Sequence, residues 1–130
     1  MINTLDSAII PAEYEIKEIP KTEYTSVLSR SEVRELVSKY DWDVEVMVDI
    51  IFCESSFRPG VINDNPTTRD FSVGLAQINL YGVNAKHRPP VEDLIDPVKN
   101  IAFAYDLYSS GGFKHWSCYK KIRIIKTLGV

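Results

Sequence analysis

The amino-acid sequence predicts a mainly α-helical domain in which a small β-hairpin flanks a cleft. Two segments carry most of this prediction: an amphipathic stretch that begins near residue 31 and an almost entirely apolar stretch over residues 42–55. A third observation is the polar, turn-rich segment 61–75, which contains short β-prone pieces. With 130 residues, the chain is long enough for one modest hydrophobic core and too short for two ordinary domains.

The first two predicted helices follow from the spacing of apolar residues. From Ser31 onward, apolar side chains recur at positions i, i+3, i+4 and i+7, which is the pattern of an amphipathic helix. These side chains are Val33, Leu36, Val37 and Tyr40. After Asp41, the expected N-cap, residues 42–55 are apolar on nearly every side, so this second helix belongs in the core. Pro59 and Gly60 mark its expected end.

The later part of the chain predicts two more helices. Asp96 followed by Pro97 is a strong helix start, because an acidic N-cap precedes proline at the first helical position. Apolar residues continue one face of this helix, and Gly111 with Gly112 ends it. Residues 116–130 predict a last helix with a basic outer side. Its basic residues are Lys120, Lys121, Arg123 and Lys126.

We interpret residues 1–28 as an N-terminal arm or linker and residues 29–130 as the folded domain. Pro11 and Pro20 interrupt any helical period in the arm. The arm has acidic residues where a signal peptide would be basic, and it has no continuous apolar segment, so we expect no recognisable signal peptide. No stretch of the chain approaches the ~20 apolar residues of a membrane span.

Charge and composition argue against several kinds of partner. The formal net charge is −3 at neutral pH, whereas nucleic-acid binding needs a concentrated basic face, so we expect no nucleic-acid partner. His87 and His115 have no companions at metal-ligand spacing, and we expect neither a metal nor another cofactor. The two cysteines, Cys53 and Cys118, allow one disulfide, but their number does not distinguish a bridge from two buried thiols.

Glu54 is the candidate catalytic residue. It lies at the C-terminal end of the most apolar predicted helix, where burial disfavours the charged carboxylate and raises its pKa. A carboxyl group with a raised pKa is a suitable general acid near neutral pH. A glutamate at a helix end is, however, more often simply solvated, so the assignment depends on the residues that follow.

Four segments have an order and separation that match a known family. They are Glu54-Ser55-Ser56-Phe57, Ser72-Val73-Gly74-Leu75-Ala76-Gln77-Ile78-Asn79, Asp96-Pro97 through Asn100-Ile101, and Gly112-Phe113-Lys114-His115-Trp116. Together they resemble the lysozyme-like superfamily, specifically its soluble lytic transglycosylase domains, with spacing similar to c-type lysozymes. The resemblance spans about residues 30–120. It implies an α+β lysozyme-like fold and an enzyme that cuts the glycan strands of bacterial peptidoglycan, with Glu54 as its acid.

The resemblance also implies substrate-binding roles for Ser72, Gln77, Asn79 and Trp116. The two amides would face N-acetyl groups and hydroxyls, although turn capping is an equal alternative for Asn79. Trp116 would pack over the catalytic glutamate and stack on sugar, with a plain core tryptophan as the alternative. Gly74 would let the backbone pass close to the sugar or to Glu54.

The resemblance favours a disulfide between Cys53 and Cys118 in an oxidising environment. In c-type lysozymes a bridge also ties the catalytic helix to the segment after the matching tryptophan, and each cysteine here adjoins a functional neighbour. A nucleophilic thiol is not expected, because no histidine is placed by motif beside Cys53.

The second carboxylate determines which reaction the resemblance implies. Ordinary glycosidases need two carboxylates, and c-type lysozymes carry an aspartate at the position of Ser72. Serine there favours a lytic transglycosylase, which cleaves the MurNAc-GlcNAc β-1,4 bond and leaves a 1,6-anhydroMurNAc end. A muramidase that uses Asp64 or Asp70 and a non-catalytic wall-binding module remain alternatives. The Ala-Tyr-Asn segment common in soluble lytic transglycosylases has Ala104-Tyr105-Asp106 as its nearest counterpart.

Such an enzyme would act at the cell wall, in the periplasm, outside the cell or on a virion. A glycan-strand cutter of this kind also suits a phage virion or a secretion apparatus that must breach the wall locally.

Overall fold

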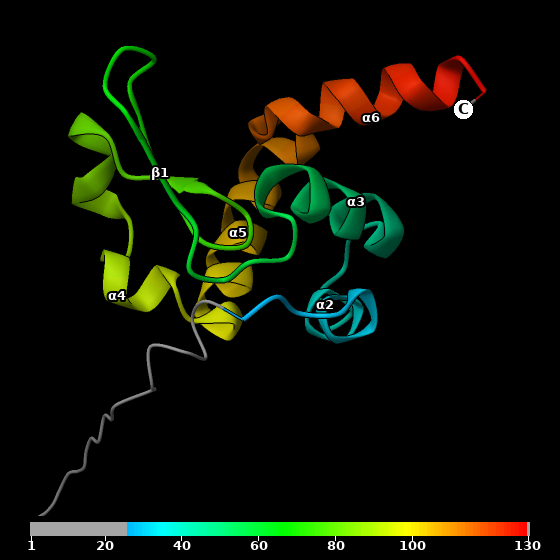
Figure 1. The fold of residues 1–130 in the computed structure, drawn as a ribbon, viewed down its shortest axis with the longest axis horizontal. Coiled ribbons are helices and arrows are strands. Elements are labelled where there is room, and N and C mark those ends of the chain that lie inside the picture. Colours follow the sequence, from blue (N-terminus) through cyan, green and yellow to red (C-terminus); the bar gives the residue numbers. More distant parts are fainter. Residues whose placement is uncertain (1–25, 130) are drawn as a thin grey trace, which may run out of the picture.

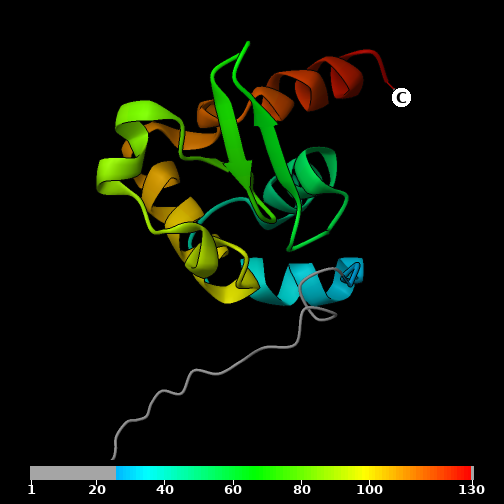
Figure 2. The ribbon, with the colours of Figure 1, turned by 60° about the vertical axis from the view of Figure 1, so that its left-hand side comes forward.

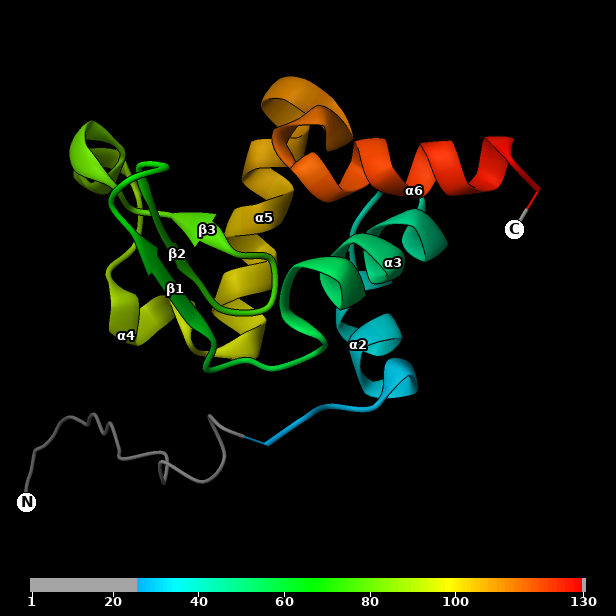
Figure 3. The same ribbon diagram turned by 45° about the horizontal axis from the view of Figure 1, so that its top comes forward.

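The computed structural model describes residues 26–129, in which a small sheet and a group of helices lie on opposite sides of one central helix (Figures 1 and 3). The central helix is α5 (Pro97–Gly111), and the sheet consists of β1 (Ile62–Asn65), β2 (Asp70–Val73) and β3 (Ile78–Asn79). The helices α2 (Arg30–Val37), α3 (Val44–Ser55) and α6 (Ser117–Thr127) lie on the other side. This arrangement confirms the predicted mainly α fold with a small antiparallel sheet. Most of the predicted arm, residues 1–25, lies outside the described residues.

The helices α2 and α3 form the predicted pair, with one corrected boundary. A capping box at Ser29 starts α2: its hydroxyl accepts from the Glu32 N–H, and the Glu32 carboxylate accepts from the Ser29 N–H. The N-cap of α3 is Asp43, so the predicted cap at Asp41 is wrong. The indole N–H of Trp42 donates to the Val37 carbonyl at 2.7 Å, which keeps residue 42 in the turn before the helix.

The sheet is antiparallel with the strand order β1-β2-β3 (Figure 2). Ser72 in the central strand lies opposite Asn63 of β1 and Asn79 of β3. All four residues of β1 are exposed, whereas Ser72 and Val73 of β2 are buried. The predicted hairpin is therefore present, and its first strand forms the outer edge of the sheet.

Two short elements between the sheet and α5 were not predicted. They are the 3-10 helix η1 (Gly82–His87) and the helix α4 (Val91–Leu94), which follows Pro89 and Pro90. A helix of four residues is too short to show a helical period, so sequence patterns cannot reveal it.

The helix α5 starts and ends as predicted. The Asp96 carboxylate accepts from the N–H groups of Val98 and Lys99, and Gly112 caps the far end with a positive φ of 73°. A second 3-10 helix, η2 (Gly112–His115), leads from α5 to α6. The basic residues predicted on the outside of α6 are all exposed. Within residues 26–129, no helix combines the length and apolar character needed to cross a bilayer.

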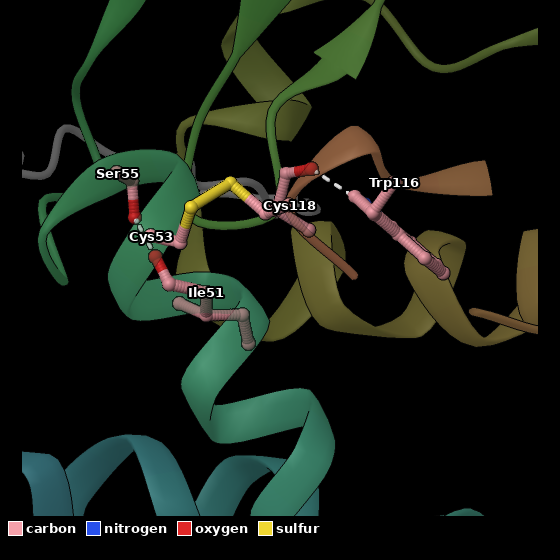
Figure 4. Close-up of a disulfide and its surroundings, with 6 residues drawn as sticks. Ile51, Cys53, Ser55, Trp116 and Cys118 are labelled. Atoms are coloured by element: carbon pink, nitrogen blue, oxygen red, sulfur yellow. Dashed lines mark hydrogen bonds between the residues drawn. A yellow bond between two sulfur atoms is a disulfide. The ribbon is translucent and has the colours of Figure 1, made fainter. Parts of the chain in front are cut away.

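A disulfide joins Cys53 of α3 to Cys118 of α6 across 65 positions of sequence (Figure 4). In the chain-entropy model, closing a loop of this length stabilises the fold by about 4 kcal/mol. We therefore expect reduction to lower the free energy of unfolding by about that amount, measured by urea denaturation with and without a reductant. Intact-mass analysis of alkylated, non-reduced protein checks the bridge directly, because two added labels would show that it is absent.

Candidate active site

A polar cleft of about 480 Å³ lies between the end of α3, the β1–β2 hairpin and the start of α6. It is lined by Glu54, Asn63, Asp64, Asn65, Asp70, Ser72, Gln77 and Ser117. Of the residues predicted from sequence, the cleft brings together Glu54, Ser72 and Gln77. It contains neither Asn79 nor Trp116 in its lining.

The Glu-Ser-Ser-Phe segment places Glu54 at the cleft. Ser55 is buried, and its hydroxyl donates to the Ile51 carbonyl at 3.1 Å, which satisfies it within the last turn of α3 (Figure 4). Ser56 and Phe57 then both adopt left-handed backbone conformations, with φ of 55° and 64°. Two such residues in succession turn the chain sharply, and the buried Phe57 ring anchors the turn. The helix thus ends at Ser55, before the predicted stop at Pro59.

Burial, a backbone N–H and two charged side chains determine the pKa of Glu54. Its pKa is raised above the ordinary value, mainly because burial disfavours the charged carboxylate, and the negative charge of Asp70 raises it further. The backbone N–H of Cys118 and the positive charge of Lys121 act in the opposite direction. A raised pKa favours the protonated form of Glu54, and an N–H that stabilises the anion favours release of the proton, so the group is suited to act as both acid and base.

Ser72 provides a hydroxyl where the c-type lysozymes have an aspartate. Besides Glu54, the carboxylates that line the cleft belong to Asp64 and Asp70. Both oxygens of Asp70 accept hydrogen bonds: the Thr68 hydroxyl donates to Oδ2 at 2.6 Å, and the Asn79 amide of β3 donates to Oδ1 at 3.4 Å. Asp70 is thus held within the sheet at the cleft wall.

Gln77 lines the cleft, but its amide is occupied by the protein. Its Nε2 donates to the carbonyls of Val61 and Gly74, at 3.2 and 3.0 Å, and its Oε1 accepts from the Asn63 amide at 2.6 Å. The residue also has a positive φ of 52°. These contacts make Gln77 a support for the turn and for Asn63, whose own side chain lines the cleft.

The side chain of Asn79 follows the turn-capping alternative. Its Oδ1 accepts from the N–H groups of Phe71 and Tyr81, at 3.0 and 2.9 Å. Its Nδ2 donates to the Arg69 carbonyl at 3.1 Å. With its amide engaged in this way, Asn79 holds β3 against the hairpin.

Trp116 follows the core-tryptophan alternative. Its side chain is 4% exposed, and its indole N–H donates to the Ala76 carbonyl at 2.9 Å (Figure 4). A ring buried to this extent has no open face for a sugar. The residue instead fixes the turn that precedes β3.

Asn100 is the most important supporting residue that sequence analysis left without a role. It is fully buried in α5: its Oδ1 accepts from the Ala76 N–H, and its Nδ2 donates to the carbonyls of Val73 and Leu94. The three distances are 2.9, 3.0 and 2.8 Å. The sequence does give one indication of this role, because Asn100 lies four residues after the Asp96 cap, within the family-like segment from Asp96 to Ile101.

Gly74 is required by Asn100, which corrects the expectation that it accommodates sugar or Glu54. Its φ is +82°, and a Cβ there would lie 2.2 Å from the Asn100 amide nitrogen and 2.3 Å from the Leu94 carbonyl oxygen. Any side chain would therefore displace Asn100.

The described part of the chain contains no group of three or more histidine, cysteine, aspartate or glutamate side chains that could hold a metal ion. His87 and His115 are both exposed, and His115 Nε2 lies 3.4 Å from the Ser110 hydroxyl.

A half-buried glutamate at a helix end, beside a small sheet that walls a polar cleft, is the arrangement expected of a lysozyme-like fold. A family model described as the transglycosylase SLT domain matches residues 32–111, which is more than half of the chain. The chain belongs to the transglycosylase SLT domain family. Its general function is that of a lytic transglycosylase-type, lysozyme-like enzyme that acts on the peptidoglycan of the cell wall. A comparison with curated proteins found no matching sequence.

Proposed function

We propose that the protein is a peptidoglycan lytic transglycosylase that cleaves the MurNAc-GlcNAc β-1,4 bond and leaves 1,6-anhydroMurNAc ends. The observation that carries this proposal is the composition of the cleft, in which the half-buried Glu54 is accompanied by the Ser72 hydroxyl at the strand position of a second carboxylate. Asp64 and Asp70 are carried by β1 and β2, and both oxygens of Asp70 accept hydrogen bonds from Thr68 and Asn79.

One carboxyl group is sufficient for this reaction. Protonated Glu54 donates its proton to the glycosidic oxygen as the bond from that oxygen to C1 of MurNAc breaks. The resulting carboxylate then removes the proton from the C6 hydroxyl of the same MurNAc, and O6 bonds to C1. The glutamate ends protonated, no water is consumed, and the proton balance closes.

The environment of Glu54 suits both steps. Burial and Asp70 favour the protonated form that begins the reaction, while the Cys118 N–H and Lys121 stabilise the carboxylate that exists between the two proton transfers. In this proposal Ser72 and Asn63 contact the glycan from the strand side of the cleft, and Gln77 acts by holding Asn63.

The products of digestion test the proposal. Muropeptides released from purified sacculi should carry 1,6-anhydro ends and weigh one water less than hydrolytic products, as measured by mass spectrometry. Asp70→Asn should retain turnover within about tenfold of the parent, because its carboxylate has no required proton or nucleophile role. Asp64→Asn should likewise retain turnover, because the proposal gives neither carboxylate of the hairpin a required role.

A hydrolytic muramidase is the second candidate, and one observation favours it. Asp70 lines the same cleft as Glu54, and its charge acts on the Glu54 carboxyl group. In this mechanism Asp70 would position a water or act as the nucleophile. Reducing ends as the main product, with a loss of about a thousandfold for Asp70→Asn, would select this candidate. No turnover at all would select a non-catalytic wall-binding module.

We also infer that the protein opens the wall locally, as part of a phage virion or a secretion apparatus. The match to the transglycosylase SLT domain supports this setting, because an assembly that must cross the wall needs a domain that cuts glycan strands. Detection of the protein in purified virions or isolated secretion complexes would test the inference.

A further inference from the structure

We infer that the Cys53–Cys118 disulfide is a positioning element for Glu54, which it holds against the backbone N–H of Cys118 at the start of α6. The inference deepens the proposed function and rests on it, because it concerns the proton that Glu54 exchanges with the glycan.

The bridge joins the two residues that determine this contact. Cys53 immediately precedes Glu54 at the end of α3, and Cys118, whose Cα lies 6.0 Å from that of Cys53, is the second residue of α6. The backbone N–H of Cys118 lowers the pKa of Glu54, in agreement with this placement. Ser117, immediately before Cys118, lines the same cleft as Glu54. Figure 4 shows the sulfur-sulfur bond linking Cys53 in the last turn of α3 to Cys118 at the start of α6. The cross-link is therefore placed at the cleft itself.

The start of α6 is a favourable place for a negatively charged partner. The first N–H groups of a helix have no acceptor within the helix, and they form the positive end of its dipole. The N-cap of α6 is Trp116, which makes no side-chain cap hydrogen bond, and the first turn has no acidic residue. Glu54, at the end of α3, supplies this charge from outside the helix whenever its carboxyl group is ionised.

The other charged groups around Glu54 are on the elements that form the cleft. Lys121 on α6 favours its carboxylate, and Asp70 on β2 favours its protonated form. Asp64 on β1 also lines the cleft. The Cys118 N–H differs from these groups in that its position depends directly on the bridge.

The family match adds an independent reason to examine this contact. The segment that matches the transglycosylase SLT domain ends at residue 111, before α6 begins at Ser117. The wall formed by α6 thus lies outside the matched segment, while Glu54 lies within it. The disulfide is the covalent link between these two parts of the cleft.

We expect the bridge to influence how readily Glu54 gives its proton to the glycosidic oxygen and takes one from the C6 hydroxyl. With the bridge intact, the Cys118 N–H partly offsets burial, so the Glu54 proton is released more readily to the glycosidic oxygen. Without the bridge, the start of α6 is held less closely, the carboxylate loses stabilisation, and the pKa of Glu54 rises. The alkaline limb of the pH-activity profile, where the general acid loses its proton, should then move to higher pH by about half a unit.

The test begins with the wild-type protein and nuclear magnetic resonance. The amide signal of Cys118 should shift with pH at the same midpoint as the Glu54 carboxyl carbon. In Glu54→Gln the Cys118 amide should lose this transition. An amide that does not follow the Glu54 midpoint would overturn the inference, and this measurement does not depend on whether a cysteine variant folds.

The second part uses the paired variant Cys53→Ser/Cys118→Ser. When it is folded, its Glu54 midpoint and its alkaline activity limb should both move upward, whereas a purely structural bridge would lower activity without moving either. Lys126→Gln is the matched control, because it removes a 4.0 Å ion pair with Asp49 that also connects α3 to α6 and keeps the Arg30–Asp49 ion pair. An unchanged midpoint in the folded paired variant would reject the inference.

The two proposals fail separately in these experiments. The resonance measurements require no turnover, so reducing-end products would reject the transglycosylase assignment and leave the positioning role standing. Conversely, anhydro products from a protein whose Cys118 amide does not titrate with Glu54 would reject only the positioning role.

Discussion

Replacement of Glu54 by glutamine is expected to lower the rate of wall lysis by about a thousandfold or more, without unfolding the protein. The amide retains the shape of the side chain but has no proton to transfer to the glycosidic oxygen. Turbidity loss of purified sacculi measures the effect. Glu45→Gln on the same helix is the matched control and should leave activity unchanged, because Glu45 is exposed and pairs with Arg34. Retention of more than a tenth of the activity by Glu54→Gln would remove Glu54 from the mechanism.

The same variant has a predictable effect on stability. Because the folded-state pKa of Glu54 is raised, its contribution to stability is present below the unfolded-state pKa and is lost as pH rises through the folded-state pKa. Glu54→Gln should therefore be at least as stable as the parent at pH about 8, and the difference should vanish near pH 4. Urea denaturation at the two pH values measures both effects.

Replacement of Asn100 by leucine is expected to lower the free energy of unfolding by about 3 to 5 kcal/mol. The change leaves the buried N–H of Ala76 and the carbonyls of Val73 and Leu94 without their partner. Such a loss is a large part of the stability of a small domain. Urea denaturation measures it, and Asn65→Ala, at an exposed asparagine, should cost less than about 1 kcal/mol. A loss below about 1 kcal/mol for Asn100→Leu would contradict the supporting role.

The elements that could be predicted from sequence are those determined by neighbouring residues. The apolar spacing of α2 and the Asp96-Pro97 start of α5 depend on residues within a few positions of each other, and both were found. The cap at Asp43 was missed because Asp41 satisfies the same local rule. Two contacts distinguish them: the Asp43 carboxylate accepts from the Val46 N–H, and the Trp42 indole N–H donates to the Val37 carbonyl.

The roles of the site side chains were harder to predict because their partners are distant in sequence. Glu54 was identified by its helix and its motif. Trp116, in contrast, bonds to Ala76 across 40 positions, and nothing near it in the sequence indicates that its indole is occupied. Asn79 likewise had two equal interpretations, and the choice depended on where the Arg69 carbonyl and the Phe71 N–H lie in the folded hairpin.

The two sides of the cleft are anchored to the fold in different ways. The N–H of Ala76 is held by Asn100 of α5, and its carbonyl is held by Trp116, so the turn before Gln77 is clamped from two helical segments at once. The opposite margin is β1, an exposed edge strand joined to the rest of the cleft through β2 and the Asn63–Gln77 bond. A glycan strand bound in this cleft, as proposed above, would therefore contact a turn anchored by two helical segments on one side and an exposed edge strand on the other.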